Sequence, residues 1–247
     1  MSSLQALELR SPQRSVELAA LRVAPAVTAA PLLLEGITKR WRAGQAPVLD
    51  DVSLALAPGT STLICGRNGV GKTTLMRIAA GLIDADAGRA AVLGATVHEQ
   101  RARYQQLVAF LPAGDRGLYA RLTVKHHLEF WARIAMVPRA RLRAAVEETI
   151  DAFELRELQG RRVDRMSMGQ RQRLRIAMTF LPAPAVVLLD EPLTSLDSEG
   201  VELLQGACAE VRARNGAVLW CVPNEEHARG GFDTRWTLKD GRLVADD

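Results

Sequence analysis

Long apolar runs and secretion signals are missing from this sequence of 247 residues. A membrane-spanning helix needs about 18 or more successive apolar residues, but the most apolar early run, residues 24–34, is broken by Pro25 and Pro31. No basic segment of the kind that opens a secretion signal closely precedes that run. Cysteine is scarce, and the three cysteines have no metal-ligand spacing, which favours buried, reduced thiols. These absences favour a soluble, cytoplasmic protein.

A large excess of charge of one sign is also missing, because 32 Lys and Arg stand against 28 Asp and Glu. The exception is local: residues 121–175 carry 13 basic and 7 acidic side chains. Such a segment can bind nucleic acid or an anionic membrane surface. Its acids are interleaved with its bases, however, which favours a solvated, arginine-rich face over a nucleic-acid site. With 48% hydrophobic residues, the chain can bury a full core.

A glycine-rich segment, residues 66–74, reads GRNGVGKTT and fits the pattern G-x-x-x-x-G-K-[ST]. A β-prone run precedes it at residues 60–65, and a helical pattern follows at residues 74–81. Backbone N–H groups converge in such a turn at the positive end of a helix dipole, which suits a polyphosphate. We expect Lys72 to reach the β- and γ-phosphates of a nucleoside triphosphate and the Thr73 hydroxyl to hold Mg²⁺. The predicted nucleotide contacts on this loop are Gly66, Arg67, Asn68, Gly69, Val70, Gly71, Lys72, Thr73 and Thr74.

Two further segments follow the glycine-rich loop in the sequence. Residues 166–170 read MSMGQ, and four apolar residues, 186–189, lead into Asp190 and Glu191. A strand buried on both faces ends where it meets the nucleotide, so an acid there can be a magnesium ligand. Together with the loop, these segments resemble the ATP-binding cassette (ABC) ATPases, the motors of ABC transporters. The resemblance covers residues 32–244.

The resemblance implies roles for individual side chains. Asp190 matches the aspartate that holds Mg²⁺ directly or through water. Glu191 matches the catalytic glutamate that orients and deprotonates the attacking water, and Lys72 is expected to act with it in catalysis. Trp41 matches an aromatic residue that stacks on adenine. Ordinary packing of this tryptophan in the core is the alternative interpretation.

The segment at residues 166–170 resembles the signature loop of the family, usually LSGGQ, with Met168 in place of a glycine. In the family this loop contacts ATP bound to a second nucleotide-binding domain, so a head-to-tail dimer, either homodimer or heterodimer, is implied. Residues 195–197 match the D-loop, which links the two sites across that dimer. The residues expected at this shared interface are Ser167, Gly169, Gln170 and Asp197.

The sequence departs from the family at two positions. No glutamine of the Q-loop follows residues 111–112, where Asp115 is either a substitute oxygen ligand or a solvated loop acid. The switch histidine is replaced by Pro223, which is followed by Asn224, and His227 comes four residues late and is expected on a helix surface. Without that histidine the γ-phosphate lacks a donor in the transition state. Hydrolysis is therefore expected to be slow or to depend on a partner.

The predicted fold class is α/β: a P-loop NTPase core with a helical insert near residues 120–180 and an antiparallel β element. Residues 1–31 are expected to form a mobile N-terminal extension, and residues 32–247 the ABC nucleotide-binding domain. Strands are predicted at residues 32–41, 48–56, 60–65, 90–93, 107–111, 186–189, 218–222, 234–239 and 242–245. Asp240-Gly241 predicts that the last two form a hairpin. Helices are predicted at residues 74–81 and 98–106, twice within 123–158 on either side of Pro138, and at 171–181.

The stretch at residues 117–134 resembles a segment of the ATPases of ABC-2-type exporters, where a hydrophobic turn receives a helix of the membrane subunit. Ordinary packing of the helical insert is the alternative. The resemblance implies the ATP-hydrolysing subunit of an ABC exporter, attached to the inner face of the cell membrane through a separate transmembrane permease. A soluble ABC ATPase that acts on nucleic acid or on a protein complex is the second hypothesis. The substrate stays open, and an importing direction is not excluded.

Overall fold

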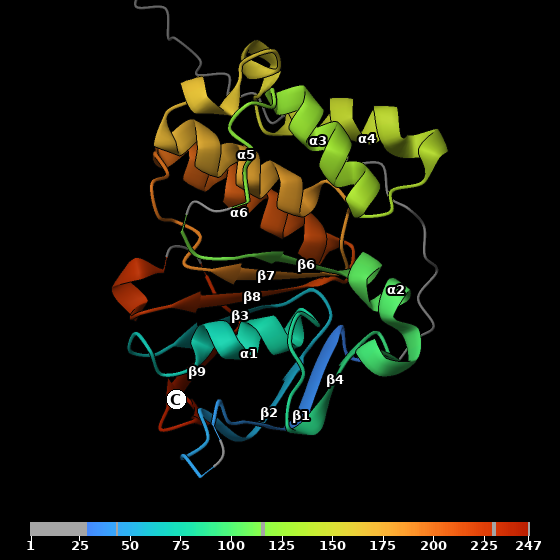
Figure 1. Ribbon diagram of the computed structural model, residues 1–247. Helices are drawn as coiled ribbons and strands as arrows, with labels where there is room; N and C mark the ends of the chain where they lie inside the picture. Colours follow the sequence, from blue (N-terminus) through green and yellow to red (C-terminus); the bar gives the residue numbers. More distant parts are fainter. Residues whose placement is uncertain (1–28, 43, 115–116, 229–230, 247) are drawn as a thin grey trace, which may run out of the picture.

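The computed structural model describes residues 29–42, 44–114, 117–228 and 231–246, and its backbone forms two β-sheets with helices around them (Figure 1). The extension predicted for residues 1–31 lies outside the described residues, apart from its last three. Asp115 also lies outside them.

The smaller sheet is antiparallel, with the strand order β2-β1-β4-β5. In β2 buried and exposed residues alternate from Val52 onward, so one face of this sheet packs against the rest of the protein and the other meets water. The strands are β1 (Leu32–Lys39), β2 (Leu49–Leu56), β4 (Ala87–Val92) and β5 (Ala95–Thr96).

The larger sheet has the order β10-β9-β3-β8-β7-β6 and is parallel except for the edge strand β10. Every residue of β3, β7 and β8 is buried, which explains the continuous apolar runs of β7, up to Leu189, and of β8. Because parallel strands end at one edge of a sheet, the segments after β3, β7 and β8 meet there. The strands are β3 (Ser61–Cys65), β6 (Val108–Leu111), β7 (Val186–Asp190), β8 (Ala217–Val222), β9 (Thr234–Lys239) and β10 (Arg242–Ala245).

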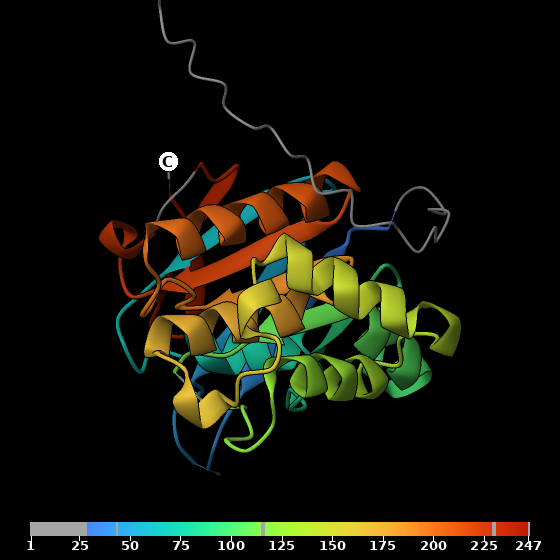
Figure 2. The ribbon, with the colours of Figure 1, turned by 90° about the horizontal axis from the view of Figure 1, so that it is seen from above.

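Helices cover both faces of the larger sheet. In Figure 1, α5 and α6 lie above it, whereas α1 and the antiparallel sheet lie below it. Helices α3 and α4 pack on the outer side of α5, as the view from above shows (Figure 2). The helices are α1 (Lys72–Ala79), α2 (Val97–Leu107), α3 (Val124–Ile134), α4 (Arg139–Ala152), α5 (Met168–Phe180) and α6 (Ser198–Ala213).

The larger sheet divides the core into two clusters of buried side chains. Leu63 and Val187 belong to the cluster under α5 and α6, whereas their neighbours Ile64 and Leu188 belong to the cluster around α1. This alternation follows from the two-residue period of a strand. It makes the sheet a rigid layer with packed side chains on both faces, and the segments that follow its strands are positioned by it.

Most predicted elements are confirmed, and the hairpin at residues 234–245 has the predicted bounds. The prediction missed α6 and the short strand β5, and it began α5 three residues too late. Helix α5 begins at Met168 because Ser167 and Gln170 form a capping box: each side chain bonds to the backbone N–H of the other, at 3.2 and 3.1 Å. No helix in the described part of the chain is long and apolar enough to cross a membrane.

Candidate functional site

The glycine-rich loop lies between the end of β3 and the start of α1, against backbone from distant parts of the chain. A Cβ atom on Gly66 would stand 2.7 Å from the carbonyl oxygen of Leu238 in β9, and one on Gly71 would stand 2.9 Å from that of Val48. Gly71 also has a φ of 120°, a conformation that favours glycine. The loop therefore needs glycine at both positions for its shape alone.

The first turn of α1 has no cap from its own residues. Gly71 precedes the helix and offers no side chain that could accept a hydrogen bond from its N–H groups. These donors are thus left for another acceptor, at the positive end of the helix dipole. The nine nucleotide contacts predicted on the glycine-rich segment lie on this loop or in this turn. The arrangement fits a phosphate group.

The Lys72 side chain is buried, 5% exposed, and lies over the glycine-rich loop. Its Nζ donates to the carbonyl oxygen of Gly66 at 2.5 Å and to that of Arg67 at 3.2 Å. Within the described residues no carboxylate forms an ion pair with this ammonium group. A buried cation held only by neutral carbonyl groups is well suited to bind an anion.

Thr73 and Asp190 are 117 positions apart in the sequence and are joined by a hydrogen bond. The Thr73 hydroxyl donates to Asp190 Oδ2 at 2.7 Å, which links the start of α1 to the end of β7. Burial raises the pKa of Asp190, the Thr73 hydrogen bond lowers it, and the nearby charge of Glu191 raises it again, with a net increase. The ionised carboxylate is therefore destabilised in the absence of a cation.

The oxygens of Thr73 and Asp190 are hard donors of the kind that Mg²⁺ prefers. Among the described residues no group of three or more His, Cys, Asp or Glu side chains could hold a metal by itself. A magnesium ion at this place would therefore complete its coordination with phosphate oxygens and water, as is usual for this ion. The donor set fits Mg²⁺ that arrives with a nucleotide.

Glu191 follows Asp190 directly and has a left-handed backbone, with a φ of 49°. Its N–H donates to the carbonyl oxygen of Cys221 at 2.9 Å, so the neighbouring strand β8 holds the turn in place. A residue with a side chain in this conformation stores strain, and such strain concentrates at functional sites. Glu191 lines an open pocket of about 440 Å³ at this edge of the sheet.

Pro223 and His227 line the same pocket as Glu191. Pro223 follows the end of β8, and His227 lies on the short 3₁₀ helix Glu225–His227, where its ring bonds to the side chain of Asn224. The predicted helix-surface position of His227 is thus confirmed, although the surface is the rim of this pocket. The sequence pattern gave no sign that this histidine would lie in the pocket that Glu191 lines.

The residues of the predicted shared interface lie apart from the glycine-rich loop. No hydrogen bond or ion pair recorded for the described residues joins Ser167, Gly169, Gln170 or Asp197 to residues 66–74. Met168 is 66% exposed at the start of α5. An added Cβ on Gly169 would lie 3.3 Å from the Ser195 carbonyl oxygen, so the two predicted motifs are neighbours. Asp197 caps α6 by accepting from the Gly200 N–H at 2.8 Å.

Trp41 is 58% exposed and does not belong to the core, so the alternative of ordinary packing is wrong. It follows the end of β1, and the Lys39 ammonium lies 5.6 Å from the centre of its ring. Because more than half of the Trp41 surface is exposed, its ring is accessible to a flat base.

Residues 49–194 match the protein family described as ABC transporter. The chain belongs to this family. It is 30% identical over 194 residues to the ABC transporter ATP-binding protein NatA of Bacillus subtilis, covering 78% of this chain and 79% of NatA. It is 33% identical over 217 residues to the daunorubicin resistance ATP-binding protein DrrA2 of Streptomyces coeruleorubidus. The match covers 86% of this chain and 65% of DrrA2.

A third relative is named for import: the phosphonates import ATP-binding protein PhnC of Rhodopseudomonas palustris, 30% identical over 230 residues, covering 87% of this chain and 83% of PhnC. Solved ABC structures share the fold. The ATP-binding subunit of an ABC transporter has a TM-score of 0.78 at 24% identity, covering 87% of this chain and 89% of that one. The predicted α/β fold is thus confirmed, and the chain is an ABC ATPase that binds ATP and works with a transmembrane permease.

One charged residue beside the site of this ABC ATPase was not predicted from the sequence. Arg175 lies in α5 among the buried residues Leu174, Ile176 and Ala177 and is only 5% exposed. Its one signal in the sequence is a basic side chain inside an otherwise apolar stretch of the helix. Its hydrogen-bond partners lie on segments that are far away in the sequence.

Proposed function

We propose that this chain is the ATP-hydrolysing subunit of an ABC exporter and that it works as a dimer. The observation that supports ATP hydrolysis at this site is the hydrogen bond of 2.7 Å between Thr73 and Asp190. It joins the glycine-rich loop to the strand end on which Glu191 follows. A phosphate site, a pair of metal-binding oxygens and a general base thus lie at one edge of the sheet.

In this proposal the loop amides and the Lys72 ammonium bind the β- and γ-phosphates of ATP. Thr73 and Asp190 hold Mg²⁺, which when bound neutralises negative charge on the phosphates. Glu191 accepts a hydrogen bond from the attacking water and takes its proton. The exposed ring of Trp41 stacks on the adenine. No histidine follows β8 directly to donate to the γ-phosphate, so slow turnover of the isolated chain is part of the proposal.

We propose that a second nucleotide-binding domain, either a second copy of this chain or a partner, contacts the exposed start of α5. Ser167 and Met168 face solvent there, so they are accessible to another chain. In a head-to-tail dimer, Ser167, Gly169 and Gln170 would contact ATP held by the glycine-rich loop of the partner. Asp197, which precedes α6, would link the two sites. Residues 32–247 form one nucleotide-binding domain in this proposal, with α3, α4 and α5 as its helical insert.

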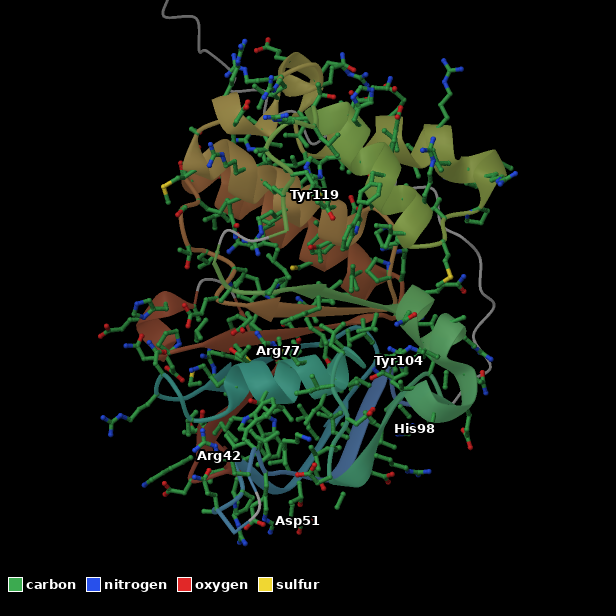
Figure 3. All side chains as sticks on the ribbon, in the orientation of Figure 1. Arg42, Asp51, Arg77, His98, Tyr104 and Tyr119 are labelled. Atoms are coloured by element: carbon green, nitrogen blue, oxygen red, sulfur yellow. The ribbon has the colours of Figure 1, made fainter. Side chains whose placement is uncertain are left out.

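The permease contact is proposed at an exposed aromatic pair beside α3. Tyr119, labelled in Figure 3, is 58% exposed, and Phe130 is 37% exposed. Their rings meet edge to face with centroids 5.7 Å apart. Large exposed apolar side chains of this kind mark interaction sites. Contact with a permease there would hold the protein on the inner face of the cell membrane. Export is favoured by the resemblance of residues 117–134 to exporter ATPases, whereas the likeness to PhnC favours import as the second candidate.

The variant Glu191→Gln tests the proposal. It keeps the shape of the side chain but cannot take a proton from water, so we expect ATP binding without turnover and a trapped dimer. Light scattering after size exclusion should then show twice the chain mass of 26.9 kDa with ATP and Mg²⁺, and one chain mass without them. Glu226→Gln changes an exposed acid of the same pocket and serves as the matched control. Hydrolysis by Glu191→Gln at the wild-type rate would show that another group is the base.

A further inference from the structure

The buried guanidinium group of Arg175 ties α5 to the segment that follows β6. Its Nη2 donates to the carbonyl oxygen of Pro112 at 2.5 Å, and its Nη1 donates to that of Gly114. Burial of a charge is costly unless its donors are used. The planar fork of an arginine places its N–H groups so that they can reach two carbonyl groups at once. The segment after β6 is therefore held to the helix by a rigid clamp.

A second link leads from the same helix to the turn that carries Glu191. Arg175 Nη1 also donates to Gln172 Oε1 at 2.6 Å, one turn earlier in α5. The Gln172 amide is then oriented so that its Nε2 donates to the carbonyl oxygen of Pro192 at 3.0 Å, and this side chain is 6% exposed. Pro192 is the residue after Glu191. The hydrogen bonds thus run without a gap from the segment after β6, through α5, to the turn at Glu191.

We propose that Arg175 is a positioning residue that couples these two segments, so that a displacement of residues 112–114 changes the position of the Glu191 carboxylate. The inference rests on the proposed function of Glu191 as the base. The clamp lies where the Q-loop glutamine is missing from the sequence. Among the residues that the structure describes, Arg175 and Gln172 of α5 connect residues 112–114 with the turn at Glu191. Buried networks of this kind specify one arrangement because every donor in them has a partner.

Hydrogen exchange of the whole chain, read by mass spectrometry without nucleotide, tests the coupling. Arg175→Met removes the guanidinium and keeps an apolar stem, so we expect faster exchange both at residues 108–114 and at residues 191–196. Gln172→Leu cuts only the second link and should speed exchange only at residues 191–196. The matched control is Thr179→Val, which removes a buried hydrogen bond of 2.9 Å from the same helix and should affect neither segment. Unchanged exchange at residues 191–196 in Arg175→Met would overturn the proposal.

Steady-state kinetics supply the second readout. A misplaced base slows the chemical step more than it weakens ATP binding, so Arg175→Met should lower kcat by about 10- to 100-fold with KM changed by less than about threefold. Arg175→Lys keeps the charge but not the fork, so its kcat should lie between those of Arg175→Met and the wild type. It also replaces Arg175→Met if that variant does not fold. Equal kcat for Arg175→Met and the wild type would contradict the role, whereas a failure of Glu191 as the base would appear only in Glu191→Gln.

Discussion

Lys72→Ala is the most direct test of the phosphate site. The ammonium group is held above the loop by the Gly66 and Arg67 carbonyls, so ordering this side chain should cost little on binding. A hydrogen bond to a charged group contributes about 1.5–3 kcal/mol. Loss of one such contact with the β- or γ-phosphate should therefore weaken ATP binding by about 10- to 150-fold.

Calorimetric titration with ATP and Mg²⁺ measures this change. The matched control is Arg77→Ala, which removes the same charge from an exposed side chain in the last turn of α1 (Figure 3). The Arg77 charge acts on Asp190 only through space, so this variant should lose far less ATP affinity than Lys72→Ala. If Lys72→Ala, folded as the unfolding temperature shows, binds ATP as tightly as Arg77→Ala, the role of Lys72 in the phosphate site is refuted.

Three further changes follow from the structure. Because burial raises the pKa of Asp190 above 3.8, its ionisation opposes folding, and stability is lost as pH rises from 3.8 through the raised value. Asp190→Asn should remove this loss from the unfolding temperature of the nucleotide-free protein, and an unchanged pH profile would contradict the prediction. Pro223→His should raise steady-state ATP turnover by less than about tenfold, because one donor typically contributes about 10²–10³ in rate but the Q-loop glutamine is also absent. Wild-type turnover already typical of ABC ATPases without a partner would show that His227 or Asn224 fills the role. Tyr104→Phe should lower the free energy of unfolding in urea by about 1 kcal/mol, since the buried hydroxyl donates to the Ala79 carbonyl oxygen at 2.5 Å; no change would show that this bond contributes nothing.

The sequence predicted those elements whose side chains carry a local signal. The continuous apolar run at residues 186–189 predicted β7, and the Asp240-Gly241 pair predicted the hairpin of β9 and β10. Helix α6 was missed because it has two internal glycines, which weaken the helical pattern, and because its stability comes from the Asp197 cap and from packing on the sheet.

The candidate site was predictable where motif and geometry coincide, as in the glycine-rich loop and the end of β7. The strained turn at Glu191 was not, since a φ of 49° depends on the hydrogen bond from its N–H to β8. The position of His227 beside the pocket of Glu191 and the clamp of Arg175 both arise from contacts between segments far apart in the chain. Periodicity and spacing predict local structure along the chain. They do not predict contacts between segments that are far apart in the sequence.

The close fit of Gly66 under the Leu238 carbonyl has a consequence for the order in which the site forms during synthesis. A ribosome makes the chain from its N-terminus, so the glycine-rich loop emerges long before β9. Until β9 pairs with β3, one wall of that loop is absent, although the residues proposed to contact phosphate have all been made. We therefore expect a nascent chain that ends before residue 234 to bind ATP weakly, so that nucleotide binding reports the arrival of the last hairpin.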